Sequence, residues 1–247
     1  METVYQAEYA GRPVRFAFQY PKTKLYFRSW LHPVDGEDYD ARATAEEIAR
    51  AHELIPEGNA EDYAEYKALI GVTSRVLLRQ GCCIFHAVAF LWRGKAWLLT
   101  APSGTGKTTQ FLNWRRAFPS EIQMICGDMP VLEQLADGSI RVHPTNWSGK
   151  ESLGSRTAAP LGGIILLEQG SENRIARMTA HDAVIPILGQ FCIDPETEED
   201  IRTLFALLDR MLSGYPVWKL VNLGDEASTR LLKETLAPMT GGYNGTV

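Results

Sequence analysis

The sequence predicts a mixed α/β fold, and three observations support this class. Segments with strand-like alternation and segments with helical periodicity follow one another along the chain. A glycine-rich loop, Ala101–Thr109, stands directly between a predicted strand and a predicted helix. The strand that enters this loop forms a tight hairpin with the apolar segment before it. We therefore predict a β-then-α accessory segment over residues 1–80, a larger α/β domain over 81–237 and a loose glycine-rich tail over 238–247.

The first 80 residues are predicted to form strands followed by two helices. Period-two alternation predicts strands over Thr3–Tyr9, Val14–Gln19 and Lys24–Trp30, the first two joined in a hairpin. Thr44–Glu47 (Thr-Ala-Glu-Glu) has the pattern of a capping box and predicts the start of a helix. Asn59 is the predicted cap of a second helix. This segment contains no catalytic motif.

The predicted domain over 81–237 alternates strands with helices. Its predicted strands are Cys82–Trp92, Ala96–Thr100, Gln123–Cys126, Val131–Leu135, Ile140–His143, Leu161–Glu168, Asn173–Met178 and Val217–Leu223. One helix follows the glycine-rich loop to about Ala117, and further helices begin at the predicted caps Thr179, Asp194 and Asp225. Gly214 is the predicted end of the helix that follows Asp194.

The composition is that of an ordinary soluble domain and excludes several classes of protein. Hydrophobic residues make up 45% of the 247 residues, and 25 Lys and Arg face 30 Asp and Glu, which disfavours nucleic acid as a partner. No apolar run approaches the roughly 18 residues of a membrane span, and no secretory signal is visible. The four cysteines lack CxxC spacing, which favours reduced thiols over a disulfide or zinc framework. We expect a cytoplasmic protein without a membrane partner, and a homo-oligomer remains open.

The loop Ala101–Thr109 matches the phosphate-loop pattern G-x-x-x-x-G-K-[ST] except that alanine stands first. Its glycines allow successive N–H groups to form a concave nest for an anion, and the following helix adds its positive N-terminal end. In this pattern the lysine reaches the β- and γ-phosphates and the next hydroxyl ligates Mg²⁺. The predicted nucleotide-binding residues are Ser103, Gly104, Thr105, Gly106, Lys107, Thr108 and Thr109. The alternative is a glycine-rich turn with an exposed lysine.

Around this loop the sequence resembles the HPr kinase and phosphoenolpyruvate carboxykinase superfamily. The resemblance rests on Phe85–Val88 (Phe-His-Ala-Val), Ser103–Thr109 and Cys126–Asp128, in the order histidine strand, turn, strand, loop, helix, strand and acid. It is specific over about residues 82–170 and looser towards 237. The resemblance implies a P-loop core of this type that uses ATP and Mg²⁺. Residues 1–80 do not resemble the N-terminal domain of full-length HPr kinase, so its protein substrate is not implied.

The sequence departs from the family pattern at two positions. Ala101 replaces the first glycine of the loop, which is tolerable where φ is negative. The family carries two consecutive acids after the next strand, whereas Gly127-Asp128-Met129 offers one. Asp128 is therefore the candidate acid, and its role as catalytic base or as metal ligand stays open. The alternative for Asp128 is a turn residue after Gly127.

Three further residues are candidates for the site. His86 resembles the family histidine near the transferred phosphate, although a histidine among apolar residues is by default a core residue. The segment Asn146–Glu151 stands at about the position where the family has a loop that closes the active site. By this resemblance Lys150 contacts the γ-phosphate or an anionic acceptor and Glu151 completes the Mg²⁺ shell. The alternative is an exposed polar turn anchored by Trp147.

The leading functional hypothesis is an ATP-dependent kinase that transfers a phosphoryl group to a hydroxyl of a peptide, protein or small molecule. Its predicted catalytic residues are Asp128, His86, Lys107 and Lys150, and its predicted metal-binding residues are Thr108, Asp128 and Glu151. A small carboxykinase-like enzyme is disfavoured because no arginine cluster for oxaloacetate is evident. The third hypothesis is a non-catalytic nucleotide-binding switch module. It stays open because the sequence has one acid where the family has two, and Ala101 where the family has glycine. The sequence does not identify the acceptor.

Overall fold

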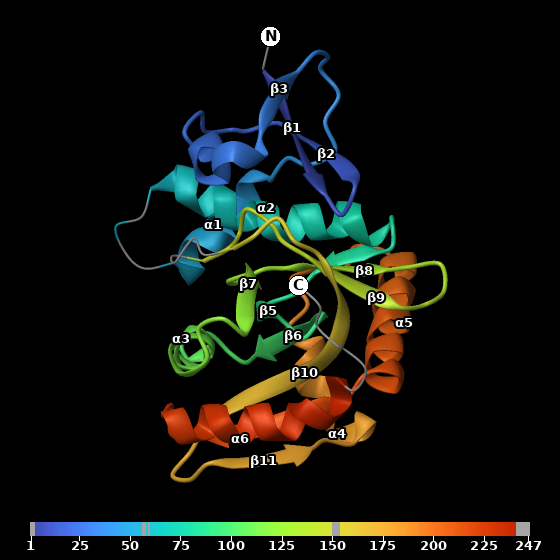
Figure 1. Cartoon of the computed structure of the whole chain (residues 1–247). Coiled ribbons are helices and arrows are strands. Elements are labelled where there is room, and N and C mark those ends of the chain that lie inside the picture. Colours follow the sequence, from blue (N-terminus) through green and yellow to red (C-terminus); the bar gives the residue numbers. More distant parts are fainter. Residues whose placement is uncertain (1–2, 56–57, 59, 150–153, 241–247) are drawn as a thin grey trace. The chain divides into compact units, whose positions relative to one another are not determined.

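A computed structural model describes residues 3–55, 58, 60–149 and 154–240. The chain is mixed α/β, with helices and a mixed sheet, as the sequence predicts (Figure 1). It divides into two compact units. Unit 1 comprises Met1–Ile84 and Cys192–Leu204, and unit 2 comprises Phe85–Phe191 and Phe205–Val247.

Unit 1 contains a small antiparallel sheet and two α-helices. The sheet has the order β2-β1-β3, built from β1 (Val4–Tyr9), β2 (Arg12–Phe16) and β3 (His32–Val34). The helices are α1 (Ala45–Leu54) and α2 (Glu61–Leu78), followed by β4 (Cys82–Ile84). The capping box predicted at Thr44 is present, because Thr44 Oγ1 accepts from Glu47 N and the Glu47 carboxylate accepts from Thr44 N. Ala60 is the N-cap of α2, and the predicted cap Asn59 lies outside the described residues.

The strand predicted over Lys24–Trp30 is wrong, because this segment is the 3-10 helix η1 (Thr23–Trp30). Its buried residues, Thr23 and Phe27, are four apart, which is a helical spacing. The start of η1 is fixed by α2, since Thr23 Oγ1 donates to the Glu65 carboxylate and to the Asp62 carbonyl. A contact between residues about 40 positions apart in the sequence therefore overrides the local β-propensity.

Unit 2 is built on a mixed sheet with the strand order β8-β9-β10-β6-β5-β7, and β12 pairs with β10 and β11. Its strands are β5 (Val88–Trp92), β6 (Lys95–Thr100), β7 (Ile122–Cys126), β8 (Val131–Gln134), β9 (Ile140–His143), β10 (Ala159–Gln169), β11 (Arg174–Arg177) and β12 (Val217–Asn222). The predicted hairpin is present, with β5 antiparallel to β6 across the turn at Arg93 and Gly94. β6, β10 and β12 are mutually parallel.

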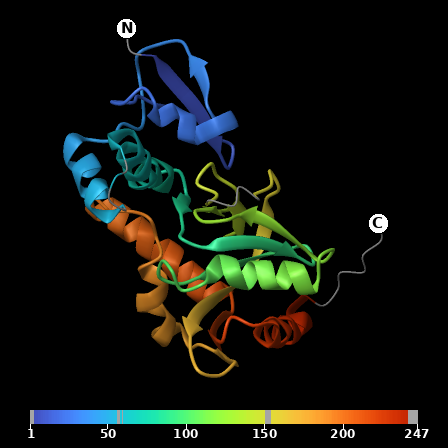
Figure 2. The same cartoon turned by 90° about the vertical axis from the view of Figure 1, so that its left-hand side faces the viewer.

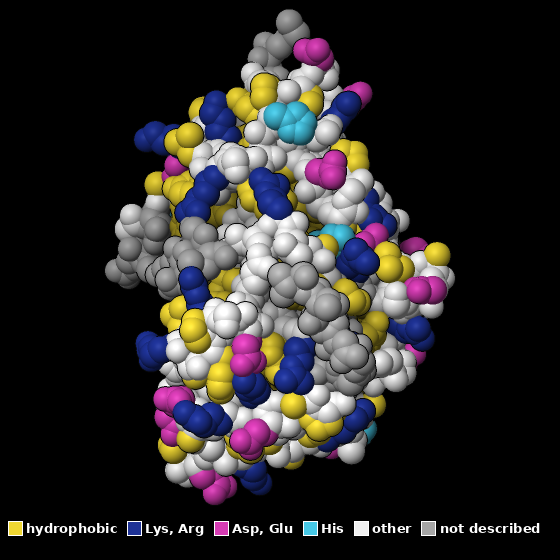
Figure 3. All heavy atoms as spheres, viewed as in Figure 1, with side chains coloured by type: hydrophobic (Ala, Val, Ile, Leu, Met, Phe, Trp, Pro, Cys, Tyr) yellow, Lys and Arg dark blue, Asp and Glu magenta, His cyan; other side chains and the backbone are white. Residues whose placement is uncertain are grey.

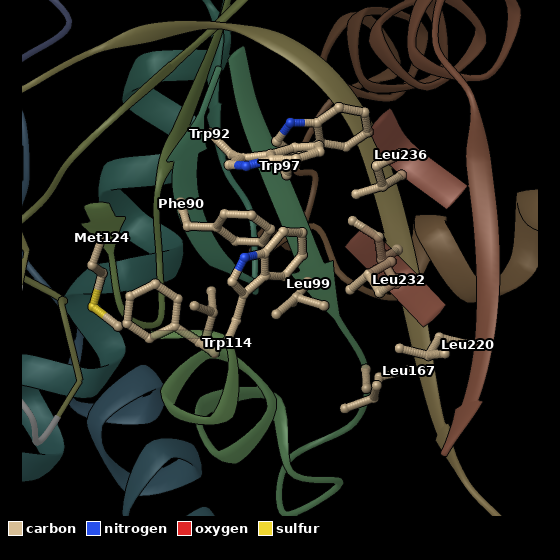
Figure 4. Close-up of a cluster of buried hydrophobic side chains, with 14 residues drawn as sticks. Phe90, Trp92, Trp97, Leu99, Trp114, Met124, Leu167, Leu220, Leu232 and Leu236 are labelled. Atoms are coloured by element: carbon tan, nitrogen blue, oxygen red, sulfur yellow. The ribbon is translucent and has the colours of Figure 1, made fainter. Parts of the chain in front are cut away.

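Helices α3 (Lys107–Ala117) and α6 (Glu226–Leu236) run alongside this sheet (Figures 1 and 2). Alternate residues of the strands enter one apolar cluster with them, as period two requires. Figure 4 shows Trp114 of α3 beside Phe90, with Leu232 and Leu236 of α6 on the other side of the cluster. The ring centroids of Phe90 and Trp114 are 5.1 Å apart. The helix that follows the glycine-rich loop is thus fixed to the sheet by large aromatic side chains.

The single strand predicted over Cys82–Trp92 is interrupted at Phe85–Ala87. Three successive backbone N–H groups bond to different segments: Phe85 N to Pro130 O, His86 N to Gln190 O and Ala87 N to Asp128 O. The apolar run continues through the interruption, so its hydrophobicity could not reveal the change of partners. His86 therefore lies just before β5 rather than inside a strand.

The remaining helices of the chain lie close to their predicted positions, with one wrong start. α4 (Ala180–Leu188) begins at the predicted cap Thr179, and α6 begins at the predicted cap Asp225. α5 (Glu198–Gly214) ends at Gly214 as predicted but begins after Thr197 rather than at Asp194. Thr197 and Asp200 form a reciprocal cap there, since Thr197 N donates to Asp200 and Asp200 N donates to Thr197 Oγ1. This side-chain pair determines the start more strongly than the Asp-Pro sequence does.

The 3-10 helix η2 (Ala237–Thr240) takes in residues 238–240 of the predicted loose tail, and residues 241–247 lie outside the described part. Within the described residues, none of the helices combines the length and apolarity that crossing a lipid bilayer requires. Basic, acidic and hydrophobic side chains are interspersed on the face seen in Figure 3. The net charge of −5 is therefore not gathered into one patch on that face.

Candidate functional site

The candidate site lies at one edge of the unit 2 sheet. β5 is antiparallel to both β6 and β7, so β6 and β7 end at the edge where β5 begins. The glycine-rich loop follows β6, Asp128 follows β7 and His86 precedes β5, which brings all three to this edge. The carboxyl end of β10 lies there too, because β10 is parallel to β6. Ligands of α/β sheets commonly bind at such an edge.

The loop between β6 and α3 contains two glycines with positive φ. Gly104 and Gly106 have φ values of +80° and +104°, which side-chain-bearing residues rarely adopt. A Cβ at either position would meet no atom within 4 Å, so conformation rather than space requires glycine. Gly106 is the N-cap of α3 and has no side chain to accept from the first-turn N–H groups. Ala101 is buried and is not among the residues with positive φ, so alanine fits there without strain.

Lys107 lies in the first turn of α3 and folds back onto the loop. Its Nζ donates to Ala101 O at 2.9 Å and to Pro102 O at 3.4 Å, and the residue is only 8% exposed. The lysine is therefore not an exposed turn residue. Its ammonium group lies beside the glycine-rich backbone, where a phosphate held by the loop would meet a positive charge.

His86 is bonded both to the strand that enters the loop and to the segment of Asp128. Thr100 Oγ1, directly before the loop, donates to His86 O at 2.7 Å. Ala87 N donates to Asp128 O at 2.8 Å. The side chains also approach each other, with 3.5 Å between His86 Nε2 and Asp128 Oδ1. The side chains of His86 and Asp128 are 19% and 30% exposed, so both are accessible to a bound molecule.

Gly127, directly before Asp128, is required by a close backbone approach. A Cβ at Gly127 would lie 2.2 Å from Ser148 O, which no side chain can tolerate. Met129 N also donates to Trp147 O at 2.9 Å. The predicted loop at 146–149 is thus packed against the candidate acid. Lys150 and Glu151, which were predicted to close the site, lie outside the described residues.

The residues at this edge offer donors that suit an anion such as the phosphates of a nucleoside triphosphate. The glycine nest, the free helix N-terminus and Lys107 together supply donors for an anion. Within the described residues, no group of three His, Cys, Asp or Glu side chains is placed to hold a metal ion. Thr108, half-buried on α3, and Asp128 remain the residues that would hold Mg²⁺ brought in with a nucleotide.

Three glutamines missed by sequence reasoning support the site. Gln190 contacts the His86 ring, with 3.2 Å between Gln190 Oε1 and His86 Nδ1. Gln169, at the end of β10, donates from Nε2 to Thr105 O in the loop at 3.3 Å. Gln110, one turn into α3, is buried between Ser228 and Thr229 of α6. No local pattern singles out these residues, because each acts on a distant segment.

Other polar groups of interest have different roles in the structure. His143 bonds through Nε2 to the Glu133 carboxylate at 2.7 Å. Cys82, Cys83 and Cys126 are buried and Cys192 is partly buried. Burial raises the pKa of the Cys126 thiol, although hydrogen bonds from the Asp128 and Thr145 backbone oppose this. Cys126, two residues before Asp128, is therefore a neutral thiol at physiological pH.

Comparisons with known proteins add a weak structural similarity. No protein-family model matches the chain, and no curated protein matches it. Among solved structures, the chain is similar to the Hpr(Ser) kinase/phosphatase from Coxiella burnetii at 12% sequence identity and a TM-score of 0.34. The match covers 63% of this chain and 93% of that chain. Similarity at this level does not establish the family of the chain.

Proposed function

We propose that this chain is an ATP-dependent kinase of the HPr kinase-like class, acting on a hydroxyl of a peptide, protein or small molecule. The observation that carries the proposal is the bonding of the His86–Ala87 segment to Thr100 on one side and to Asp128 on the other. Thr100, which enters the phosphate loop, and Asp128, the candidate acid, are each bonded to the His86–Ala87 segment. A phosphate-binding loop near a carboxylate that can orient the acceptor or hold the metal is an arrangement that phosphoryl transfer uses.

In this proposal each residue has a defined task. The N–H groups of Ser103–Thr109 and the Lys107 ammonium hold the β- and γ-phosphates, with Thr108 at the metal. MgATP supplies the transferred phosphoryl group and neutralises part of its charge. The acceptor oxygen bonds to the γ-phosphorus, the bond from that phosphorus to the β–γ bridging oxygen breaks, and ADP leaves. Asp128 either takes the acceptor proton or holds the metal, and both tasks require its negative charge.

The experiment measures MgATP binding by calorimetry and slow ATP hydrolysis to water, so it does not require the acceptor. Asp128→Asn keeps size but removes charge, and we expect hydrolysis to fall at least about a hundredfold with little change in MgATP affinity. Lys107→Met keeps the buried stem but removes the ammonium, and we expect loss of tight MgATP binding. Asp209→Asn, an exposed position on α5, is the control for the loss of one carboxylate.

The results separate the proposal from its alternatives. Unchanged MgATP affinity in Lys107→Met would remove the phosphate-loop assignment. Stabilisation of the wild type by MgATP without any turnover would favour a nucleotide-binding switch module. If the wild type hydrolyses ATP and Asp128→Asn hydrolyses it equally fast, another acid acts, and Glu151 would be tested next.

A further inference from the structure

Gln190 is a buried polar residue beside the candidate site, in the turn that follows α4. It is 8% exposed, and Gly189 before it is the C-cap of the helix. Its backbone is fixed on both sides, because Gln190 N donates to Ile187 O at 3.0 Å and Gln190 O accepts from His86 N at 2.8 Å. The neighbouring rings of Phe85 and Phe191 pack edge to face with centroids 5.1 Å apart. The position of this turn against His86 therefore does not depend on the Gln190 side chain.

The side chain of Gln190 adds a separate contact with the imidazole. Gln190 Oε1 lies 3.2 Å from His86 Nδ1. An amide oxygen only accepts hydrogen bonds, so this contact requires a proton on Nδ1. It also selects the ring orientation, because a ring turned over would direct carbon towards the amide. With Nδ1 bonded to Gln190, Nε2 is the nitrogen that faces Asp128 Oδ1 at 3.5 Å.

Packing alone does not explain an amide at this position. A buried amide loses its hydration, and that cost is offset only by hydrogen bonds within the protein. Methionine would fill similar space without this cost. The contact with His86 Nδ1 is one that glutamine can make and an apolar residue of the same length cannot.

We propose that Gln190 is a positioning residue for His86: its Oε1 accepts a hydrogen bond from His86 Nδ1–H and so directs Nε2 towards Asp128. The predicted effect of Gln190 on turnover rests on the proposed kinase function, whereas the predicted protonation and orientation of the His86 ring do not. With its proton on Nδ1, a neutral His86 presents an unprotonated Nε2, which can accept a hydrogen bond from a group bound beside the glycine-rich loop but donates none to the Asp128 carboxylate. Partners that fix the orientation of a functional histidine commonly change activity about tenfold to hundredfold when removed.

The first measurement is a long-range ¹H–¹⁵N correlation spectrum of the nucleotide-free protein labelled with ¹⁵N-histidine, recorded at pH 7. The chain has five histidines, and the signals lost in His86→Phe identify those of His86. We expect the wild type to carry the proton on Nδ1, and we expect Gln190→Met to change this pattern. Gln190→Glu keeps an acceptor oxygen and should restore it. Gln134→Met, at an exposed position on β8, is the matched control.

The second measurement is ATP hydrolysis by the same variants. Gln190→Met should lower kcat about tenfold to hundredfold while KM for MgATP changes by less than about threefold, and Gln190→Glu should recover most of the loss. A merely structural role would lower thermal stability without this separation of kcat from KM and without rescue by glutamate.

Two results would overturn the proposal. The first is a spectrum of the wild type in which His86 carries its proton on Nε2 and Nδ1 has none. The second is a spectrum of Gln190→Met in which the His86 signals are unchanged from the wild type. The first needs no variant, so it holds even if Gln190→Met fails to fold. If the wild type neither binds MgATP nor hydrolyses it, the proposed kinase function fails, and the spectra still decide the role of Gln190.

Discussion

The buried Glu65 carboxylate of unit 1 is tightly bonded, whereas the Asp128 carboxylate and the His86 imidazole near the glycine-rich loop of unit 2 approach each other only loosely. The buried Glu65 carboxylate of unit 1 accepts from Gln19 N at 2.6 Å and Tyr20 N at 3.0 Å, in addition to Thr23. In unit 2, His86 and Asp128 approach only to 3.5 Å and both remain accessible.

The difference teaches how structural and functional charges can be told apart. A buried carboxylate whose oxygens are all engaged by its own chain is part of the fold, because removing it leaves several donors without partners. A half-exposed carboxylate with one long contact beside an open glycine loop retains capacity for a bound molecule.

The largest expected effect is on stability and comes from unit 1. Glu65→Ala removes the acceptor of two backbone N–H groups and of the Thr23 hydroxyl, and we expect it to lower the free energy of unfolding by about 3–5 kcal/mol. Denaturant unfolding measures this change. Glu61→Ala, exposed on the same helix, should cost less than about 0.5 kcal/mol. Equal effects of the two substitutions would contradict a structural role for Glu65.

The second prediction concerns the backbone approach beside Asp128. Gly127→Ala places a Cβ 2.2 Å from Ser148 O, so the two segments must separate. We expect a loss of about 1–3 kcal/mol in unfolding free energy together with lower ATP hydrolysis. Gly71→Ala on α2 meets no atom within 4 Å and should instead stabilise the protein by about 0.5–1 kcal/mol. A Gly127→Ala variant as stable and active as the wild type would show that the approach is not needed.

The smallest expected effect depends on pH and concerns Glu47 in unit 1. Burial by itself raises the pKa of Glu47, but the hydrogen bonds from the Thr44 backbone and from Arg75 outweigh it, and the pKa is lowered. The charged carboxylate therefore stabilises the folded state above its unfolded pKa, and this contribution is lost as pH falls through the lower folded value.

We thus expect the Tm of the wild type to exceed that of Glu47→Gln most clearly at pH 7, with the difference shrinking as pH falls below the ordinary pKa of glutamate. The contribution should be no more than about 1 kcal/mol, because the pair with Arg75 is partly solvated. Calorimetric melting between pH 7 and pH 3 measures it. Glu46→Gln, in an exposed pair with Arg50, is the control. If the difference in Tm grew as the pH fell, this would contradict a lowered pKa of Glu47 in the folded state.

Much of the local structure could be predicted from short patterns. The helix starts at Thr44, Thr179 and Asp225 agree with the structure because a capping side chain bonds to backbone N–H groups within three residues. The hairpin at Arg93 and Gly94 is similarly local. The prediction of Asp128 and His86 as site residues depended on a family resemblance, and their catalytic roles stay predictions.

The errors have a common physical origin in distant partners. η1 replaces a predicted strand because Glu65 binds its first residue. The strand break at Phe85–Ala87 arises from N–H bonds to Pro130, Gln190 and Asp128, which lie about 40 to 105 residues away along the chain. The sequence did not indicate a role for Gln190, because a glutamine after a helix matches no functional pattern until its contact with His86 is known.

By itself, the sequence determined the mixed α/β class, the hairpin, the glycine-rich loop between β6 and α3 and most element boundaries, because these depend on side-chain periodicity and on backbone bonds between near neighbours. Only the tertiary structure decided that His86 is held between Thr100, Gln190 and Asp128. The physical reason is that strand order and the partners of interrupted strands depend on which distant segments pack together. That choice is made by the burial of the whole core and not by any single segment.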